Sequence, residues 1–457
     1  MDSQWAYLPT ELLQIIFSQL PIKNLGRCSQ VCQHWRNVFD TDYPWRTFTF
    51  RDGMFVRRKF TQHSGWQYHI DHWRLRFLIT NASRKWRSLV IRPVNNLFNL
   101  YEFFRVLTNF SEYYERNSEC DKPLSLIRSF HFQWRLHVEE DDASGILQDK
   151  DIGTGGEMLH TLSNLIFHLH GLKSLTLIDL QLTHWEAEQF LQKILDSFSM
   201  QLEYLSILNV TFQPRALFHP ALFLSLRKLL LSPQMLDANC LNLISCLQKL
   251  HTLIIVQDEK CHAATVTPQA AWRTFVNQNE RRTQIWLILR GKPKVPLIIQ
   301  PGAPVYGIKM ENSSGQLKMD VAEEIGHHYS HTLRIFEQCG LERFKRGKKM
   351  NERVDNAIIH VAQSCRFLKL VACRERMSHG TALILGKLAQ SNRFKLRIRE
   401  NGLLNRICWS RHEVIEFGIN FDEMKQICKS RDTVVEEISR LTSQVSPVLR
   451  DSEYRRM

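Results

Sequence analysis

Large apolar residues recur with helical spacing near the start of the chain. The first run of them comprises Leu12, Leu13, Ile16, Phe17 and Leu20. This spacing predicts a helix with one wide apolar stripe. Pro9 suits the first turn of that helix, and Pro21 ends it. A second run predicts two further short helices, and its apolar members are Leu25, Cys28, Val31, Cys32, Trp35 and Phe39.

These helices carry more apolar surface than they can bury among themselves. A unit of roughly forty residues is near the size at which a single core is too small to be stable alone. An apolar stripe left uncovered on such a unit docks either a partner helix or groove, or the next domain of the same chain. The periodicity by itself favours neither alternative.

From residue 86 onward a different pattern recurs. An apolar residue is followed by two residues of any kind, and then by two apolar residues that one further residue separates. The clearest copies begin at Leu172, Leu202, Leu226 and Leu250, and weaker copies begin at Trp86, Ile127, Gln284, Cys365 and Arg393. The alternating pair places two side chains on one face of a strand. The segments between copies have helical spacing, as after the capping box that Thr183 and Glu186 predict.

Strand–helix units that repeat every 24 to 45 residues or so, within the range of about 20–50 residues for repeat architectures, are typical of a leucine-rich-repeat solenoid. We therefore predict an α/β fold in which three N-terminal helices are followed by an irregular solenoid of strand–helix units. The competing fold is a globular α/β domain around a parallel sheet. After Asp432 the apolar spacing is again helical, and we expect that helix to cap the last repeat.

The composition excludes some classes of protein. The chain has 457 residues, is 44% hydrophobic and 23% charged, and carries a formal charge of +14. The basic balance favours acidic partners, which include phosphorylated peptides and nucleic acid. No apolar run approaches the roughly 18 residues of a membrane span, and no signal-peptide pattern is present, so we expect a cytosolic or nuclear protein that binds no membrane. The basic run at residues 343–349 fits a nuclear-import signal or a solvated loop.

Candidate chemistry is sparse. The 11 cysteines are scattered without a CxxC pair, which is typical of free thiols in a reducing compartment. Two groups could be written as metal ligands, namely Cys261 with His262, and His327, His328 and His331 with Cys339. Histidines near the end of a helix explain the second group equally, and we expect no metal site, no cofactor and no catalytic residues. Neither a RING-type Cys–His spacing nor a Ser–His–acid constellation is supported by spacing.

The segment at residues 46–85 is rich in aromatic and basic side chains. Its members include Trp66, Tyr68, Trp73, Arg74 and Arg76. Aromatic residues interleaved with basic ones are typical of surfaces that stack on single-stranded nucleic acid. The alternative, which we favour, is that these side chains pack the N-terminal helices onto the repeats.

The N-terminal run resembles an F-box over its whole length, in order and at the usual spacings. The matching residues are Leu8, Pro9, Glu11, Leu12, Ile16, Phe17, Leu20, Pro21, Leu25, Cys28, Val31, Cys32, Trp35, Arg36 and Trp45. An F-box followed by degenerate repeats resembles the F-box/leucine-rich-repeat proteins, and the segments 271–291 and 331–372 and the C-terminal helix are most similar to the F-box only proteins thirty-three and thirty-nine.

The resemblance implies a role. F-box proteins hold a Skp-type adaptor, which links them to a cullin–RING ubiquitin ligase. The adaptor contacts that the resemblance implies are Leu8, Pro9, Ile16, Leu20, Pro21, Leu25, Val31 and Trp35. It also implies four regions: the F-box at residues 1–50, a segment at 51–85 that packs it onto the repeats, the repeats at 86–431, and a capping helix and tail at 432–457.

Substrate binding is expected on the open face of the strands, which is the usual binding face of a solenoid. Strand alternation predicts that this face carries Trp286, Arg290, Phe367, Lys369, Lys395, Arg397 and Arg399. Three neighbouring like charges on the last strand repel unless a partner neutralises them. One hypothesis is that they grip an acidic or phosphorylated segment of a protein substrate. The other is that an edge strand is made basic to prevent aggregation.

The expected function is therefore that of a non-catalytic substrate receptor in a Skp–cullin–F-box ubiquitin ligase. Two alternatives stay open. One is a scaffold that binds the adaptor but delivers nothing for degradation. The other is a nucleic-acid-binding protein, which the charge and the aromatic–basic segment suggest.

Overall fold

The computed structural model describes residues 4–62, 65–117, 124–134, 156–211, 215–261, 266–279, 282–291, 295–311, 317–340 and 355–454. The chain divides into two compact units. Unit 1 comprises Met1–Gln213 with Leu222–Leu226, and unit 2 comprises Pro214–Ala221 with Arg227–Met457. Each unit is described by itself. The basic run at residues 343–349 lies outside the described residues.

Unit 1 begins with three short helices. They are α1 (Thr10–Ser18), α2 (Ile22–Cys28) and α3 (Gln33–Phe39), flanked by the 3-10 turns η1 (Gln4–Tyr7) and η2 (Tyr43–Trp45). Pro9 and Pro21 hold the N-cap positions of α1 and α2. Both prolines are extended there, so each one starts a helix at a fixed angle to the preceding segment. Leu13, Phe17 and Val38 form the small shared core of this bundle.

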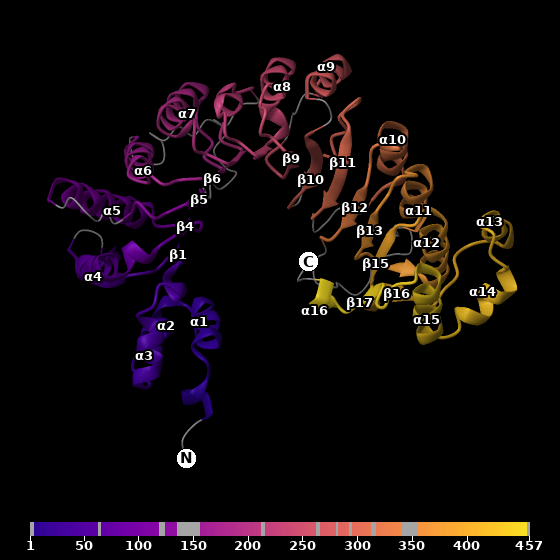
Figure 1. Ribbon diagram of the computed structural model, residues 1–457, viewed down its shortest axis with the longest axis horizontal. Helices are drawn as coiled ribbons and strands as arrows, with labels where there is room; N and C mark the ends of the chain where they lie inside the picture. Colours follow the sequence, from indigo (N-terminus) through magenta and orange to yellow (C-terminus); the bar gives the residue numbers. More distant parts are fainter. Residues whose placement is uncertain are drawn as a thin grey trace. The chain divides into compact units, whose positions relative to one another are not determined.

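The three helices lead into a parallel sheet whose strands follow one another in chain order (Figure 1). Its strands are β1 (Thr47–Phe50), β4 (Ser88–Ile91), β5 (Ser129–Gln133), β6 (Ser174–Ile178) and β7 (Tyr204–Leu208). The helices α4 (His72–Ala82), α5 (Leu97–Asn117), α6 (Glu157–Phe167) and α7 (His184–Phe198) cover one face. A sheet in which each strand pairs with the next along the chain is a solenoid, and not a doubly wound domain.

The core of unit 1 is built from rows of side chains that cross the strands. One row runs through Leu89, Phe130, Leu175 and Leu205, which are register partners. All four side chains are fully buried, as the apolar positions of the repeat pattern predict. Each repeat thus covers the face that its neighbour leaves open. The α/β solenoid predicted from the sequence is confirmed.

Unit 2 continues the same design. Its strands are β8 (Lys228–Leu231), β9 (Thr252–Gln257), β10 (Gln284–Leu289), β11 (Val305–Met310), β12 (Ile335–Gln338), β13 (Leu370–Cys373), β15 (Lys395–Arg399) and β17 (Val448–Leu449), all parallel. The helices on one face are α8 (Ala238–Ser245), α9 (Gln269–Asn279), α10 (Met319–Tyr329), α11 (Asp355–Ser364) and α12 (His379–Asn392).

Smaller elements complete unit 2. They are the paired strands β14 (Met377–Ser378) and β16 (Leu403–Leu404), and the helices α13 (Arg411–Glu416), α14 (Phe421–Ile427), α15 (Arg431–Thr442) and α16 (Asp451–Tyr454). Helix α15 packs against α12 through the buried side chains of Val434 and Ile438. The remaining 3-10 turns of the chain are η3 (Ser83–Lys85), η4 (His219–Leu222), η5 (Pro233–Met235) and η6 (Glu400–Gly402).

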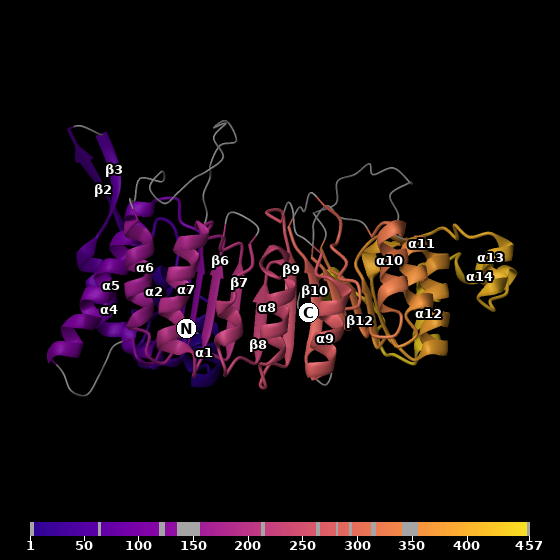
Figure 2. The same cartoon turned by 90° about the horizontal axis from the view of Figure 1, so that it is seen from above.

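The aromatic–basic segment folds differently from our expectation. Strands β2 (Val56–Thr61) and β3 (Gly65–Ile70) form an antiparallel hairpin that projects from unit 1 (Figure 2). Trp66 and Tyr68 on the hairpin and Trp73 on α4 are exposed, so the prediction that they pack the N-terminal helices onto the repeats is wrong. A two-stranded ribbon with no second layer leaves its side chains in solvent. Phe48, stacked on Trp86 at 4.3 Å between ring centroids, provides packing at the start of the sheet instead.

Within the described residues, no helix is both long enough and apolar enough to cross a membrane.

Candidate functional site

An exposed apolar surface covers one side of the N-terminal helices. We define this N-terminal apolar face by the exposed side chains of Trp5, Tyr7, Pro9, Leu12, Ile15, Ile16, Pro21 and Val31, and the half-buried ones of Leu8, Leu20 and Trp35. Ile16 is 41% exposed and Val31 is 60% exposed. Exposed apolar side chains that gather on one small helical unit are typical of a place where another protein binds.

Helical geometry explains why this face is left open. On α1, Leu13 and Phe17 turn inward and are buried, whereas Leu12 and Ile16 lie one position earlier and point outward. Three helices of nine residues or fewer cannot cover both stripes. The inner stripe therefore forms the core, and the outer stripe needs a partner from outside this bundle.

Contacts with α3 hold the chain ahead of α1 in place. The indole Nε1 of Trp35 donates to the carbonyl oxygen of Trp5 at 3.1 Å, and His34 Nε2 donates to the carbonyl oxygen of Leu8 at 2.9 Å. The Trp35 ring packs edge-on against Phe17, with ring centroids 5.4 Å apart. These contacts preorganise the face before any partner arrives.

The predicted adaptor contacts divide into two groups. Leu8, Pro9, Ile16, Leu20, Pro21, Val31 and Trp35 all keep exposed surface. Leu25 does not, because it is only 3% exposed and belongs to the core of the three helices. Trp5, Tyr7, Leu12 and Ile15 lie on the same face and were not in the predicted set. For Leu12 and Ile15, the helical spacing from Ile16 was the signal that could have found them.

The predicted substrate residues of unit 2 differ in their surroundings. Phe367 and Lys369 lie just before the amino-terminal end of β13. The guanidinium of Arg334 stacks there over the Phe367 ring at 4.6 Å. Trp286 on β10 is half-buried, and its ring lies over Gly307 of β11, where a Cβ would come within 2.5 Å of it. Arg290 pairs with Glu311 at 2.9 Å.

The basic strand β15 follows the predicted alternation, because Leu396 and Ile398 are fully buried. Lys395 is exposed and Arg397 is half-buried, but Arg399 is only 5% exposed. Arg399 Nε lies 2.9 Å from Asp451 Oδ1 of α16, and Arg374 Nη2 lies 3.2 Å from the same oxygen. The prediction that all three basic side chains lie on the open face is therefore wrong for Arg399, because the carboxylate of Asp451 already neutralises it.

Sequence reasoning missed a groove between α9 and α10, at the amino-terminal ends of β10 and β11, which we call the edge groove. Its volume is about 650 Å³, and its lining includes Gln284 and Tyr306. Its described lining carries the basic or titratable side chains of Arg273, His328, His331 and Arg334, and no carboxylate. The groove lies next to Phe367, whose ring contacts Arg334 and, at 6.4 Å between centroids, His331.

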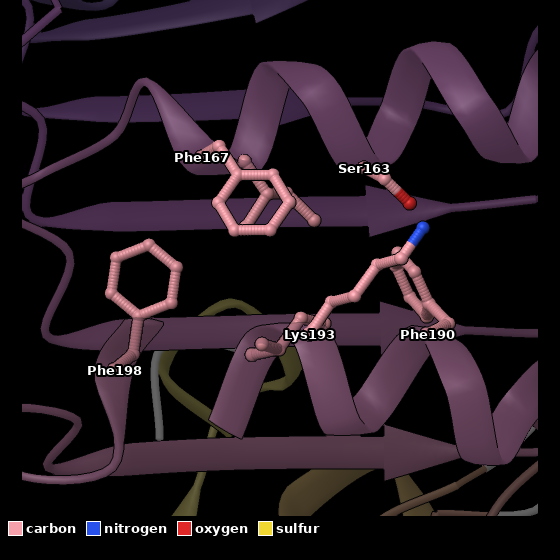
Figure 3. Close-up of a pocket in the computed structure, with 7 residues that line it drawn as sticks. Ser163, Phe167, Phe190, Lys193 and Phe198 are labelled. Carbon is pink, nitrogen blue, oxygen red and sulfur yellow. The ribbon is translucent and has the colours of Figure 1, made fainter. Parts of the chain in front are cut away.

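A second depression, between α6 and α7 of unit 1, is not a ligand site. Phe167 and Phe198 line it, and Lys193 points toward Ser163 across it (Figure 3). It contains no space for a water-sized molecule. The depression is the seam between two packed helices.

Comparisons with known proteins bear on the N-terminal region most directly. A search of curated proteins finds no match to this chain. Among solved structures, a similar chain comes from the structure titled "Crystal structure of Rad7 and Elc1 complex in yeast". The two chains are 13% identical with a TM-score of 0.34, and the match covers 89% of this chain and 92% of the other.

The family model described as F-box-like matches residues 5–51. These residues are the three helices that carry the N-terminal apolar face, together with the first strand of the sheet. The chain therefore contains an F-box-like domain at residues 5–51.

Proposed function

We propose that this protein is a non-catalytic substrate receptor of a Skp–cullin–F-box ubiquitin ligase. The observation that carries the proposal is a coincidence of position: the F-box-like match falls on the helices that expose the N-terminal apolar face. In this proposal the face binds a Skp-type adaptor, and the adaptor connects the chain to a cullin–RING ligase. The chain acts by proximity, because it holds a substrate near a carrier protein that other enzymes have loaded with ubiquitin.

The physical argument for an adaptor is the chemistry of the face. Ile16, Val31 and the prolines Pro9 and Pro21 present exposed apolar surface, and apolar side chains of this kind form the centre of protein interfaces. Anchors of this kind, desolvated at the centre of an interface, each contribute about 2 kcal/mol or more to binding. A helix or groove with a complementary apolar surface is the partner that fits.

For the substrate we propose the edge groove of unit 2 and the exposed residues beside it. Arg273 and Arg334 give the groove a positive lining, and Phe367 adds an aromatic surface at its margin. Guanidinium groups bind carboxylates and phosphates through paired hydrogen bonds. An acidic or phosphorylated segment of a protein substrate is therefore the ligand class that we propose.

Two finer proposals follow from the resemblance. We place the chain with the F-box only proteins thirty-three and thirty-nine, on the segments quoted above. We also propose that it works in the cytoplasm, the nucleus or both, where cullin–RING ligases act. Fractionation of cells that express the tagged full-length chain tests the second proposal, and recovery of the chain in a membrane or secreted fraction would contradict it.

The adaptor proposal is tested by binding measurements on purified full-length chain. Ile16→Glu and Val31→Glu place a charge in the proposed interface, and each is expected to weaken binding of a Skp-type adaptor by about 30-fold or more. Ile415→Glu is the matched control, because Ile415 is an apolar side chain that is 60% exposed and lies in unit 2. If all three variants bind the adaptor like the wild type, the N-terminal apolar face is not the adaptor site.

Measurement of substrate half-life distinguishes a substrate receptor from a scaffold that binds the adaptor but delivers nothing for degradation. A receptor that delivers substrates shortens their half-life, and the Ile16→Glu variant should lengthen it. If proteins captured through unit 2 keep the same half-life with wild type and variant, the chain binds the adaptor without serving degradation.

A specific observation supports nucleic-acid binding as a second candidate function. The β2–β3 hairpin exposes Phe60, Trp66 and Tyr68, and Arg58 stacks over the Trp66 ring at 4.5 Å. Aromatic faces beside guanidinium groups bind single strands with strong salt dependence. Titration of fluorescent single-stranded RNA and DNA tests this candidate. Binding that weakens with salt and is lost in Trp66→Ala would favour it, and no binding at low salt would reject it.

A further inference from the structure

Two histidines and a glutamate converge on the rim of unit 1, outside the surfaces discussed above. Glu115 lies in the last turn of α5, and His168 and His170 flank the buried Leu169 after α6. Glu115 Oε1 lies 3.1 Å from His168 Nδ1 and 3.1 Å from His170 Nε2. Within the described residues, this is a group in which three possible metal-ligand atoms lie within 4.8 Å of one another.

The backbone that carries the histidines is fixed by its surroundings. Leu169 and Leu172 are both fully buried and anchor the turn, whereas His168 is half-buried and His170 is exposed. The side-chain amide of Gln201 donates to the carbonyl oxygen of His170 at 3.1 Å, and Arg128 Nη1 donates to that of Gly171 at 2.9 Å. A Cβ at residue 171 would lie 2.5 Å from the carbonyl oxygen of Ser125, a backbone atom, so this close approach requires glycine.

The carboxylate is also held in position. Ser111 Oγ, one helical turn earlier on α5, donates to Glu115 Oε1 at 3.3 Å. The same carboxylate oxygen thus accepts hydrogen bonds from three side chains, those of Ser111, His168 and His170.

We propose that Glu115, His168 and His170 form a binding site for a divalent transition-metal ion, zinc being the first choice. Two imidazoles and one carboxylate are a ligand set that zinc uses, at bonds of about 2.0–2.2 Å. Tetrahedral bonds of that length separate neighbouring donors by roughly 3.3 Å. The two nitrogen–oxygen distances of 3.1 Å already have this size, and the two nitrogen atoms lie within 4.8 Å of each other.

Glu112 provides the support that metal-bound histidines usually have. Its Oε1 lies 3.8 Å from His168 Nε2, the ring nitrogen that does not face Glu115. At 3.8 Å this carboxylate is beyond hydrogen-bond distance, but it lies close enough to accept the Nε2 proton after a small rotation of the ring, which would leave Nδ1 to bind the ion. Arg116 Nη2 lies 3.5 Å from the other oxygen of Glu112 and fixes its orientation.

The site would be open on one side. His170 and Glu115 keep exposed surface, so three protein ligands leave a fourth position for water or for a ligand from another molecule. Such an ion would clamp the end of α5 to the loop before β6 (Ser174–Ile178). Sequence reasoning expected no metal, and it missed this group because Glu115 and His168 lie far apart in the chain.

Zinc titration of the purified full-length chain, stripped of metal with a chelator, tests the proposal. The wild type is expected to bind zinc, and His170→Ala and Glu115→Gln are each expected to weaken that binding by about tenfold or more, since even outer-shell changes cost 10–100-fold. Cobalt is the second probe, because ions bound by nitrogen and oxygen lack the thiolate charge-transfer absorption that cysteine ligands would give.

The control is His412→Ala. His412 lies 3.3 Å from Glu416 in a histidine–carboxylate pair of unit 2 that has one histidine in place of two. It should leave zinc binding unchanged, and zinc should raise the melting temperature of this variant and the wild type but not that of His170→Ala. If wild type, His170→Ala and His412→Ala bind zinc and respond to it equally, the three side chains form only a polar bridge and the proposal is wrong.

Discussion

The N-terminal apolar face and the basic strand β15 were both inferred from side-chain patterns, and the structure treats them differently. Ile16 and Val31 stay largely open to solvent, at 41% and 60% exposed. Arg399 of β15 is paired with Asp451, the first residue of α16. Whether an apolar stripe stays exposed can be predicted from the nearby sequence, by comparing its size with the core that the neighbouring helices can form. Whether a charge stays free cannot, because any residue that the fold brings near can neutralise it.

The largest expected effect separates the two stripes of α1. Phe17→Ala removes a buried ring and should lower the free energy of unfolding by about 3–5 kcal/mol. Ile16→Ala, at a neighbouring exposed position, should change it by less than about 0.5 kcal/mol. Chemical denaturation of the purified chain measures both. Equal destabilisation by the two variants would mean that Ile16 is covered in solution.

The next effect concerns the ion pair that occupies β15. Asp451→Asn leaves the buried Arg399 facing a neutral amide and should cost about 3 kcal/mol, as when one partner of a buried pair is removed. The matched control is Asp422→Asn, because the pair of Asp422 with Arg411 is exposed and should contribute about 0–1 kcal/mol. Urea denaturation provides both values. If Asp451→Asn loses no more unfolding free energy than Asp422→Asn, the ion pair of Arg399 with Asp451 is unimportant for stability.

A smaller effect is expected for the remaining charges of the strand. Lys395→Glu reverses an exposed charge and should change stability by less than about 0.5 kcal/mol. If β15 contributes to substrate capture, the same variant should weaken binding of acidic peptides severalfold. Arg334→Glu, in the edge groove, should weaken it more. Fluorescence anisotropy with one phosphorylated peptide library distinguishes the strand from the groove. Unchanged binding in both variants would exclude both as the acidic-substrate site.

The smallest effect is a pH dependence on the open face of unit 2. Burial alone would raise the pKa of Glu311, but the hydrogen bond from Lys309 and the charge of Arg290 outweigh it, so the pKa lies below its ordinary value of 4.5. Stability from this carboxylate is thus present above the unfolded pKa and is lost as pH falls through the lower folded pKa. Glu311→Gln should reduce the acid sensitivity of unfolding by up to about 1 kcal/mol. An identical pH profile for the variant would contradict this assignment.

The repeats were predictable because their signal is local and periodic. Leu175 and Leu205 occupy equivalent places in two copies of one pattern, and both are buried partners in adjacent strands. The three N-terminal helices were predictable for the same reason. The exposed hairpin was not, because Trp66 and Tyr68 have the composition of core residues and only the lack of a second layer leaves them in solvent.

The candidate sites were predictable to a smaller degree. Helical spacing placed Ile16 on the apolar stripe of the first helix, whereas the resemblance to an F-box put Leu25 among the adaptor contacts although Leu25 of α2 is buried. The edge groove joins Arg273 and Arg334 from two repeats, and the histidine–glutamate cluster joins α5 to the loop before β6. Contacts between repeats depend on register, which no single repeat encodes.

Hydrogen exchange with and without a Skp-type adaptor tests the central claim most directly. The account predicts that the adaptor protects α1, α2 and the start of α3, whereas β15 of unit 2 exchanges as before. Protection confined to unit 2, or none at adaptor concentrations that saturate a known F-box protein, would show that the N-terminal apolar face is not where this chain meets its ligase.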